Sequence, residues 1–247
     1  MTLVTLIFSG IILFVASLTK GATGFGFGLL AMPLLLLFLP PSFAIPLVLG
    51  LAFVDEIILQ FSIKGRVKIK RILPLLIGGI AGVPFGYFML DTFSEDSTSV
   101  VVSALIIIIG ILVLTRRLRH IPDNPIARLI VGGFSGAVHG VSSLAGPFIA
   151  SYLDSAGEKK EEFRTDMIIT TGLLTFTALI MLFRGGYFTT DLLKSWLFLL
   201  PVILLGTLIG IALEHRTNQN KFHFIVMGMV IFAGVLSLFS QLIALFG

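Results

Sequence analysis

Two glycine-rich segments, 20–28 and 135–143, interrupt otherwise apolar sequence and hold the residues best suited to chemistry. Each is called a break below. Lys20 and Thr23 lie in the first break, and His139 lies beside hydroxyl side chains in the second. Glycine lets a helix be interrupted, and a helix that restarts offers unpaired N–H groups and the positive end of its dipole. Two such ends facing each other predict a site for a small anion. Its candidate binding residues are Lys20, Thr23, Gly24, Gly26, Gly28, Ser135, Gly136, His139, Gly140, Ser142 and Ser143.

The glycines also have a purely structural interpretation. Small residues let membrane helices pack closely, and kinks alone explain Pro33 and Pro147, which follow the two breaks. Two clusters at matching positions, each beside a short apolar run, favour binding over packing alone.

Asp55 and Glu56 are acidic residues inside the apolar run 43–62. Carboxylates at membrane depth are costly and often serve proton coupling, which makes both residues candidates for coupling. Alternatively, they pair with the basic loop 62–71, because they lie only about 10 Å from it along a helix. The sequence leaves these two interpretations open.

The elements that position these residues are expected to be membrane helices. Of the 247 residues, 56% are hydrophobic and 12% charged, too few polar groups for the surface of a soluble domain. A membrane-spanning helix needs about 20 apolar residues, and 27–39, 126–138 and 143–153 are shorter than this. The predicted apolar runs are 2–19, 27–39, 43–62, 72–90, 98–115, 126–138, 143–153, 166–184, 190–213 and 221–244. No charge precedes Lys20, so the first run is expected to be retained rather than cleaved as a signal peptide.

The basic residues predict the orientation. The loops 62–71, 116–128, 154–165 and 214–221 carry nearly all Lys and Arg side chains, whereas Arg184 and Lys194 fall on the opposite side. Basic loops face the cytoplasm, so both termini are expected outside. The localisation expected is the plasma membrane, as a multi-pass protein.

The chain also repeats itself. GATGFGFGLLAMP ends at Pro33 and SGAVHGVSSLAGP at Pro147, and AGVPFGYFML (81–90) matches LGTLIGIALE (205–214). Each half holds five segments, an odd number that inverts the second half in the membrane. The fold expected is therefore an all-α integral membrane protein, a polytopic helical bundle of two inverted-topology repeats with short, glycine-broken helix pairs. The repeats are 1–120 and 121–247 within one membrane domain, a plan common in secondary transporters.

Several classes of function lack their motifs. Cysteine is absent, and neither HExxH spacing nor a phosphate-binding loop occurs. No metal, cofactor or catalytic residue is expected, although His139 near Ser142 and Ser143 leaves a Ser–His enzyme as a minor alternative. The partners expected are a small anionic substrate and the lipid bilayer, with a homodimer left open and no nucleic acid.

Particular motifs resemble the sulfite exporter TauE/SafE family over nearly the whole chain. They are the glycine-rich motif before Pro33, PPSFA (40–44), the basic loop after the third segment, and GGYF (185–188) before GTLIG (206–210). The second break reads HGVSS, where the family has a denser glycine run. The resemblance implies a secondary transporter, expected to be an exporter, of a small sulfur-containing anion such as sulfite, sulfoacetate or another organosulfonate. A passive anion channel and an assembly subunit are the alternatives.

Overall fold

Every regular element in the described part of the chain is a helix. The structure, a computed structural model, describes residues 2–62, 67–114 and 122–213. Its helices are α1 (Leu3–Thr23), α2 (Phe27–Leu35), α3 (Pro41–Gln60), α4 (Ile69–Thr92), α5 (Glu95–Leu114), α6 (Pro125–Ser142), α7 (Ala145–Ser155), α8 (Lys160–Arg184) and α9 (Thr190–Leu213). This confirms the all-α prediction. The run 221–244, the loop 214–221 and residues 116–121 of the loop 116–128 lie outside the described residues.

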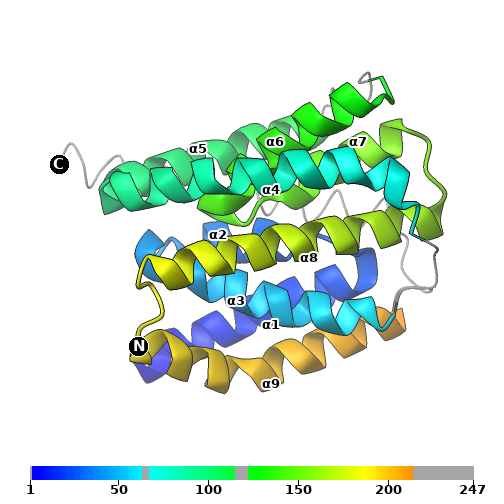
Figure 1. The fold of residues 1–247 in the computed structure, drawn as a ribbon. Helices are drawn as coiled ribbons and strands as arrows, with labels where there is room; N and C mark the ends of the chain where they lie inside the picture. Colours follow the sequence, from blue (N-terminus) through cyan, green and yellow to red (C-terminus); the bar gives the residue numbers. More distant parts are fainter. Residues whose placement is uncertain (1, 63–66, 115–121, 214–247) are drawn as a thin grey trace.

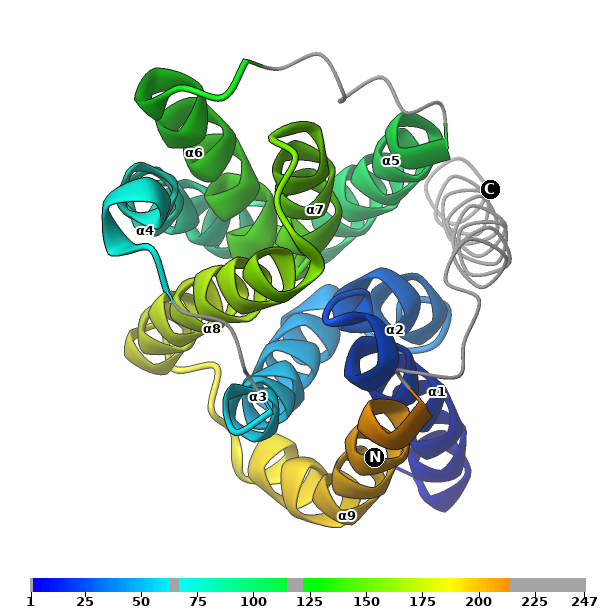
Figure 2. The same ribbon diagram turned by 90° about the vertical axis from the view of Figure 1, so that its right-hand side faces the viewer.

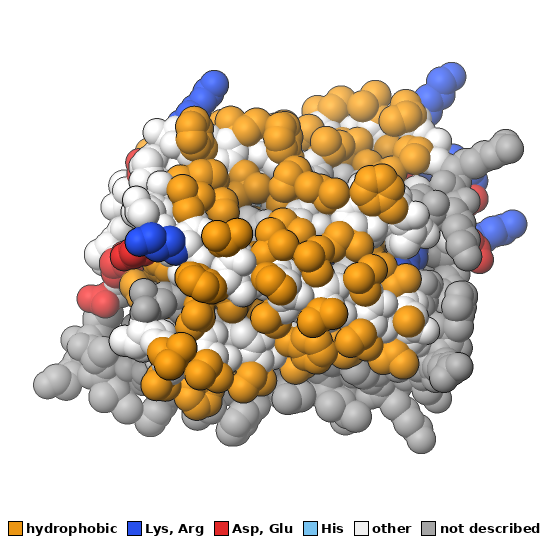
Figure 3. All heavy atoms as spheres, turned by 90° about the horizontal axis from the view of Figure 1, so that it is seen from below, with side chains coloured by type: hydrophobic (Ala, Val, Ile, Leu, Met, Phe, Trp, Pro, Cys, Tyr) orange, Lys and Arg blue, Asp and Glu red, His pale blue; other side chains and the backbone are white. Residues whose placement is uncertain are grey.

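Helix length and surface composition identify a polytopic membrane protein. Among the described helices, α1, α3, α4, α8 and α9 are long and apolar enough to cross a membrane. Large apolar side chains cover one face between charged ends (Figure 3), and Leu197 is 72% exposed. Such a surface is stable in lipid, whereas a soluble protein would aggregate through it.

The non-helical segment of the second break is shorter than the sequence suggested, because α6 ends at Ser142 and α7 begins at Ala145. Residues 126–138 were expected to form a short helix, but α6 has 18 residues and continues to Ser142. At 1.5 Å per residue it is about 27 Å long. Its glycines do not interrupt it, because they pack against α4 and thus gain contacts that offset their low helix propensity.

The helices form two groups with α8 between them. Figures 1 and 2 show α4, α5, α6 and α7 on one side, and α1, α2, α3 and α9 on the other. The most extensive packing joins α4 to α6 and α1 to α9, and α8 contacts both α3 and α4. Thus the helix before each break packs on a helix from the other half of the chain. The inverted repeat and its boundaries, 1–120 and 121–247, stay a prediction.

Glycines bring α4 and α6 into backbone contact. A Cβ on Gly78 would overlap the carbonyl oxygen of Leu129, and one on Gly82 would overlap that of Gly133. The contact is reciprocal, because Cβ atoms on Gly132 and Gly136 would overlap carbonyl oxygens of α4. Close approach of this kind is how membrane helices associate without a hydrophobic driving force.

Two adjacent glycines of α6 allow a matched test of this packing. Gly132→Ala is expected to lower the melting temperature in detergent by about 5 °C, because overpacking of this kind costs about 1–3 kcal/mol. Gly133→Ala is the control, since its Cβ would meet only Gly78 O, at 3.7 Å. This control should melt at or above the wild-type temperature. Equal losses in both variants would contradict the packing argument.

Candidate functional site

Each break is a short segment of left-handed backbone between two helices. In the first, Gly24 and Gly26 have φ angles of 88° and 100°, which glycine adopts readily. In the second, Ser143 has a φ of 60°. The chain therefore stops α1 and α6 and restarts as α2 and α7 without a long loop.

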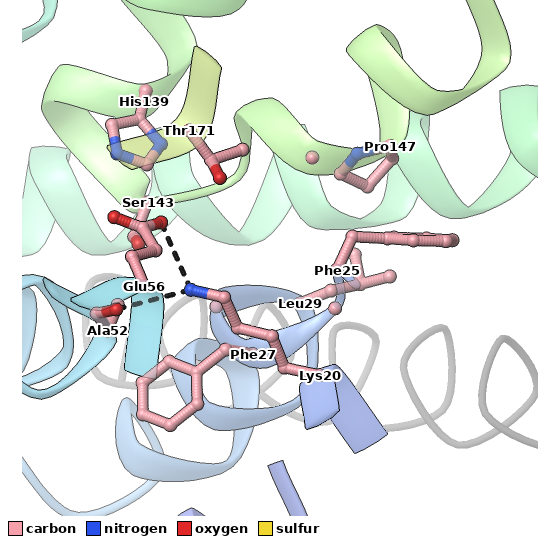
Figure 4. Close-up of a pocket in the computed structure, with 13 residues that line it drawn as sticks. Lys20, Phe25, Phe27, Leu29, Ala52, Glu56, His139, Ser143, Pro147 and Thr171 are labelled. Carbon is pink, nitrogen blue, oxygen red and sulfur yellow. Dashed lines mark hydrogen bonds and ion pairs between the residues drawn. The ribbon is translucent and has the colours of Figure 1, made fainter. Parts of the chain in front are cut away.

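The two breaks meet each other inside the bundle. A Cβ on Gly28 would overlap the carbonyl oxygen of Ser143, and one on Gly146 would lie 3.5 Å from Phe25 Cβ. A small cavity lies between them, bordered by both breaks and by α3 and α8 (Figure 4). Its lining residues are Lys20, Phe25, Gly26, Phe27, Gly28, Leu29, Ala52, Glu56, His139, Ser143, Gly146, Pro147 and Thr171.

Both restarted helices direct their N-termini to this cavity. Helix α2 begins at Phe27 and α7 begins at Ala145. Gly28, Leu29 and Gly146, all in the first turns of these helices, line the cavity. Backbone N–H groups in a first turn have no acceptor within their own helix, and the dipole adds partial positive charge. The cavity is thus suited to an anion.

Lys20 and Glu56 form a buried ion pair at the cavity. Lys20 Nζ lies 3.0 Å from Glu56 Oε1 and donates a second hydrogen bond, of 3.2 Å, to the Ala52 carbonyl oxygen (Figure 4). Lys20 is 4% exposed and Glu56 2% exposed. Phe27 places its ring centroid 5.8 Å from Nζ, where a cation–π attraction adds to the pair. A buried charge needs such partners, because isolation from water is costly.

A polar chain continues from this pair into the second half of the protein. Thr175 Oγ1 donates to Glu56 Oε1 at 3.2 Å, and His139 Nε2 lies 3.0 Å from the same hydroxyl. The groups come from α1, α3, α8 and α6, so the chain joins both groups of helices. His139 contacts a threonine, and Ser142 Oγ donates to the Val138 carbonyl. Among the described residues this geometry gives no Ser–His pair.

Asp55 faces away from the cavity. Its carboxylate accepts a hydrogen bond from Thr207 of α9, whereas Glu56, the next residue, turns toward Lys20. Both carboxylates are buried and contact other membrane helices. The alternative in which they pair with the basic loop 62–71 is therefore wrong for the described residues of that loop. The partners come from neighbouring helices instead, Lys20 from α1 and Thr207 from α9.

The predicted binding residues divide into two sets. Lys20, Gly26, Gly28, His139 and Ser143 line the cavity. Other predicted residues shape the breaks or pack helices: Thr23 Oγ1 hydrogen-bonds backbone atoms at the end of α1, and Gly136 and Gly140 pack on α4. Thr23, Gly24, Ser135, Gly136, Gly140 and Ser142 are not among the described residues that border the cavity.

Sequence reasoning missed the threonines that complete the site. Thr171 borders the cavity, Thr175 joins Glu56 to His139, and Thr207 holds Asp55. Thr171 and Thr175 carried a signal, because residues four apart share a helix face and hydroxyls are uncommon in such an apolar run. Thr207 carried the same kind of signal, because it is a hydroxyl within the apolar motif GTLIG (206–210).

A second charged cluster lies where the loops before α4, α6 and α8 meet. Arg71 contacts Asp123 at 3.5 Å, Glu158 at 3.2 Å and Glu162 at 3.4 Å. Arg128 contacts Asp123 at 2.8 Å and Glu158 at 3.4 Å. Burial raises the pKa of Glu158 above its ordinary value, and the two arginines lower it only in part. The cluster joins α4, α6 and α8 at one end of the bundle.

Comparison with known proteins supplies the family. A family model described as "Sulfite exporter TauE/SafE" matches residues 9–237, nearly the whole chain. No curated protein and no solved structure gives a significant match. Membership of this family implies membrane transport of sulfur-containing anions rather than an enzymatic reaction. The chain belongs to the sulfite exporter TauE/SafE family.

Proposed function

We propose that the protein is a secondary transporter that exports a small sulfur-containing anion, such as sulfite, sulfoacetate or another organosulfonate. The substrate binds in the cavity between the two breaks, and access alternates between the two sides of the membrane. The family supports transport of sulfur anions. The geometry of the cavity supports an anion site between the two groups of helices.

One observation carries the proposal: a buried lysine lies beside two helix N-termini in a cavity between the two groups of helices. Lys20 supplies a full positive charge, and the first turns of α2 and α7 supply backbone donors. Tetrahedral and pyramidal oxyanions match such donors, because helix N-termini bind anions through unpaired N–H groups. Discontinuous membrane helices commonly form the substrate sites of transporters at mid-membrane depth.

The orientation follows from the positive-inside rule. The end of the bundle with Lys68, Arg71 and Arg128 faces the cytoplasm in our proposal, and the N-terminus faces the opposite side. The two predicted repeats then enter the membrane from opposite sides. Rocking of one helix group against the other would open the cavity to each side of the membrane in turn. The proposed location is the plasma membrane.

Flux into proteoliposomes tests the substrate class. Purified protein is reconstituted, and uptake of sulfite, sulfoacetate, a longer sulfonate, sulfate and acetate is measured under an imposed pH gradient. We expect saturable uptake of at least one sulfur oxyanion, with acetate transported at least about ten-fold more slowly, since each 1.4 kcal/mol of binding discrimination gives a factor of ten. Protein that is folded and yet transports none of the five would refute the proposed substrate class.

The charged cluster is expected to hold the cytoplasmic side closed. Arg71 contacts three carboxylates, so Arg71→Gln removes three ion pairs at once. The protein has no cysteine, and Thr171→Cys therefore provides a single labelling site in the cavity lining. A membrane-impermeant thiol reagent applied from the cytoplasmic side should label this cysteine about ten-fold faster when Arg71→Gln is present, which corresponds to about 1.4 kcal/mol.

Arg184→Gln is the matched control for this labelling experiment. Arg184 ends α8 on the opposite side of the bundle and is exposed, so its loss should leave the labelling rate unchanged. An equal rate in the Arg71→Gln and Arg184→Gln proteins would show that the cluster does not close the site.

A further inference from the structure

The cavity holds a cation that is already neutralised. Among the described residues that line it, Lys20 is the one amine and Glu56 the one carboxylate, and they form an ion pair with an N–O distance of 3.0 Å. A substrate anion that entered beside this pair would face the Glu56 carboxylate at close range. The site would then hold one uncompensated negative charge away from water, which is strongly unfavourable.

Protonation of Glu56 removes this conflict. A neutral Glu56 carboxylic acid leaves Lys20 free to pair with the substrate anion, and with a singly charged anion the site returns to zero net charge. We propose that Glu56 couples anion transport to proton movement: the substrate anion replaces the Glu56 carboxylate beside Lys20, and Glu56 takes up one proton when it does so. This inference rests on the proposed function and adds the coupling to the same site.

The step is balanced in charge and in protons. One proton from the aqueous side binds the Glu56 carboxylate, the Lys20 ammonium keeps its three protons, and one negative charge of the substrate takes the carboxylate's place. On the other side the anion leaves, Glu56 releases its proton, and the ion pair forms again. One proton and one anionic charge therefore cross in the same direction, so export requires an outward gradient of the anion that exceeds the inward gradient of protons.

The surroundings of Glu56 identify it as the proton carrier. Its second oxygen, Oε2, is buried and has no hydrogen-bond partner among the described residues, so it is available to carry a proton. The titratable groups near it are Lys20 on α1, His139 on α6 beyond the Thr175 hydroxyl, and Asp55 on its own helix. Helix α8 faces it with the hydroxyl of Thr175 and with Gly172, and α2 contributes Phe27 to the same cavity.

Asp55 is not suited to this role. It accepts a hydrogen bond from Thr207 on α9 and is not among the described residues that line the cavity. Substrate in the cavity would therefore not replace it at a cation. The two adjacent carboxylates thus have different tasks, and this difference supplies a control.

Thermal stabilisation by sulfite tests the inference without any need for transport. The wild-type, Glu56→Gln and Asp55→Asn proteins are titrated with sodium sulfite in detergent at pH 8, with sodium chloride keeping the ionic strength constant. Glu56→Gln frees Lys20 permanently, so its half-saturating sulfite concentration should be at least about ten-fold lower than that of the wild type. Asp55→Asn changes a neighbouring buried carboxylate that is not among the described residues lining the cavity, and its half-saturating sulfite concentration should stay within about three-fold of wild type. Because all titrations are made at one pH, the same fraction of sulfite is ionised in each, and its ionisation does not affect the comparison of the three proteins.

Proton movement is measured in a second arm. Proteoliposomes with a pH indicator inside should acidify as an alkylsulfonate, which stays ionised and brings no proton of its own, enters through the wild-type protein. Entry of the same sulfonate through Glu56→Gln should neither acidify them nor respond to a pH gradient. Asp55→Asn, which changes a carboxylate that is not among the described residues lining the cavity, should keep the proton signal. The inference is overturned if sulfite binds Glu56→Gln no more tightly than the wild type, or if anion entry through Glu56→Gln is still coupled to proton movement. Absence of sulfite flux in the wild type, with the binding difference present, would count against the proposed substrate and not against the coupling.

Discussion

Lys20→Met is expected to reduce saturable transport of sulfur anions at least about 100-fold. Lys20 is the cation at the cavity, and a charge-assisted hydrogen bond to a buried anion contributes about 1.5–3 kcal/mol. A loss of about 2.8 kcal/mol corresponds to about 100-fold in affinity. The measurement is initial uptake into proteoliposomes with protein content matched by immunoblot.

Folding is the main complication of this variant, because Lys20→Met leaves the Glu56 carboxylate buried without its counter-charge. Breaking a buried pair by removing one partner costs about 3–5 kcal/mol. The double variant Lys20→Met with Glu56→Gln removes both charges and should recover wild-type expression and melting temperature. It should nevertheless fail to transport, since no cation then remains among the described residues that line the cavity. Wild-type transport by the double variant would remove Lys20 from the binding site.

Gly28→Ala is expected to lower transport at least about ten-fold. A Cβ at this position would overlap the carbonyl oxygen of Ser143, where the two breaks touch. The backbone of α2 and the second break must then separate, and overpacking of this kind costs about 1–3 kcal/mol. The first-turn N–H groups of α2 would move with it, away from the position in which they face the cavity. Uptake assays and melting curves on the same protein preparation separate loss of function from loss of fold.

Gly146→Ala is the matched control for Gly28→Ala. Gly146 occupies the first turn of α7, but its Cβ would lie 3.5 Å from Phe25 Cβ, an ordinary contact distance. This variant should fold normally and keep transport within about three-fold of wild type, a difference below 1 kcal/mol. If both alanine variants lost transport equally, added bulk rather than the contact with Ser143 would be responsible.

The sequence predicts the helical class and the neighbourhood of the site well. Hydropathy locates every described helix to within six residues at each end. The largest difference is in α8, which begins at Lys160 instead of 166, and α6 ends at Ser142 instead of 138. The sequence predicts Lys20 and His139 as binding residues because they lie in the two glycine-rich breaks, and both border the cavity. Such predictions need only local composition, which a single sequence contains.

Long-range pairing is what the sequence could not supply. Glu56 and Lys20 are 36 residues apart, and Thr207 and Asp55 are 152 apart. Whether a glycine binds ligand or packs a helix also depends on its neighbour, as Gly140 shows by packing on Val83 and Gly28 by meeting Ser143. Hydrophobic periodicity does not identify which helices face each other, because lipid-facing and helix-facing positions are both apolar.

Counterflow in proteoliposomes tests the central claim, alternating-access transport of a sulfur anion, most directly. Vesicles containing the wild-type protein are loaded with excess unlabelled sulfite and diluted into a trace of labelled sulfite. A carrier with one site exposed in turn to each side should accumulate label transiently above its equilibrium level and then lose it. A monotonic approach to equilibrium, at a rate that does not saturate, would instead identify a passive pore and contradict the account.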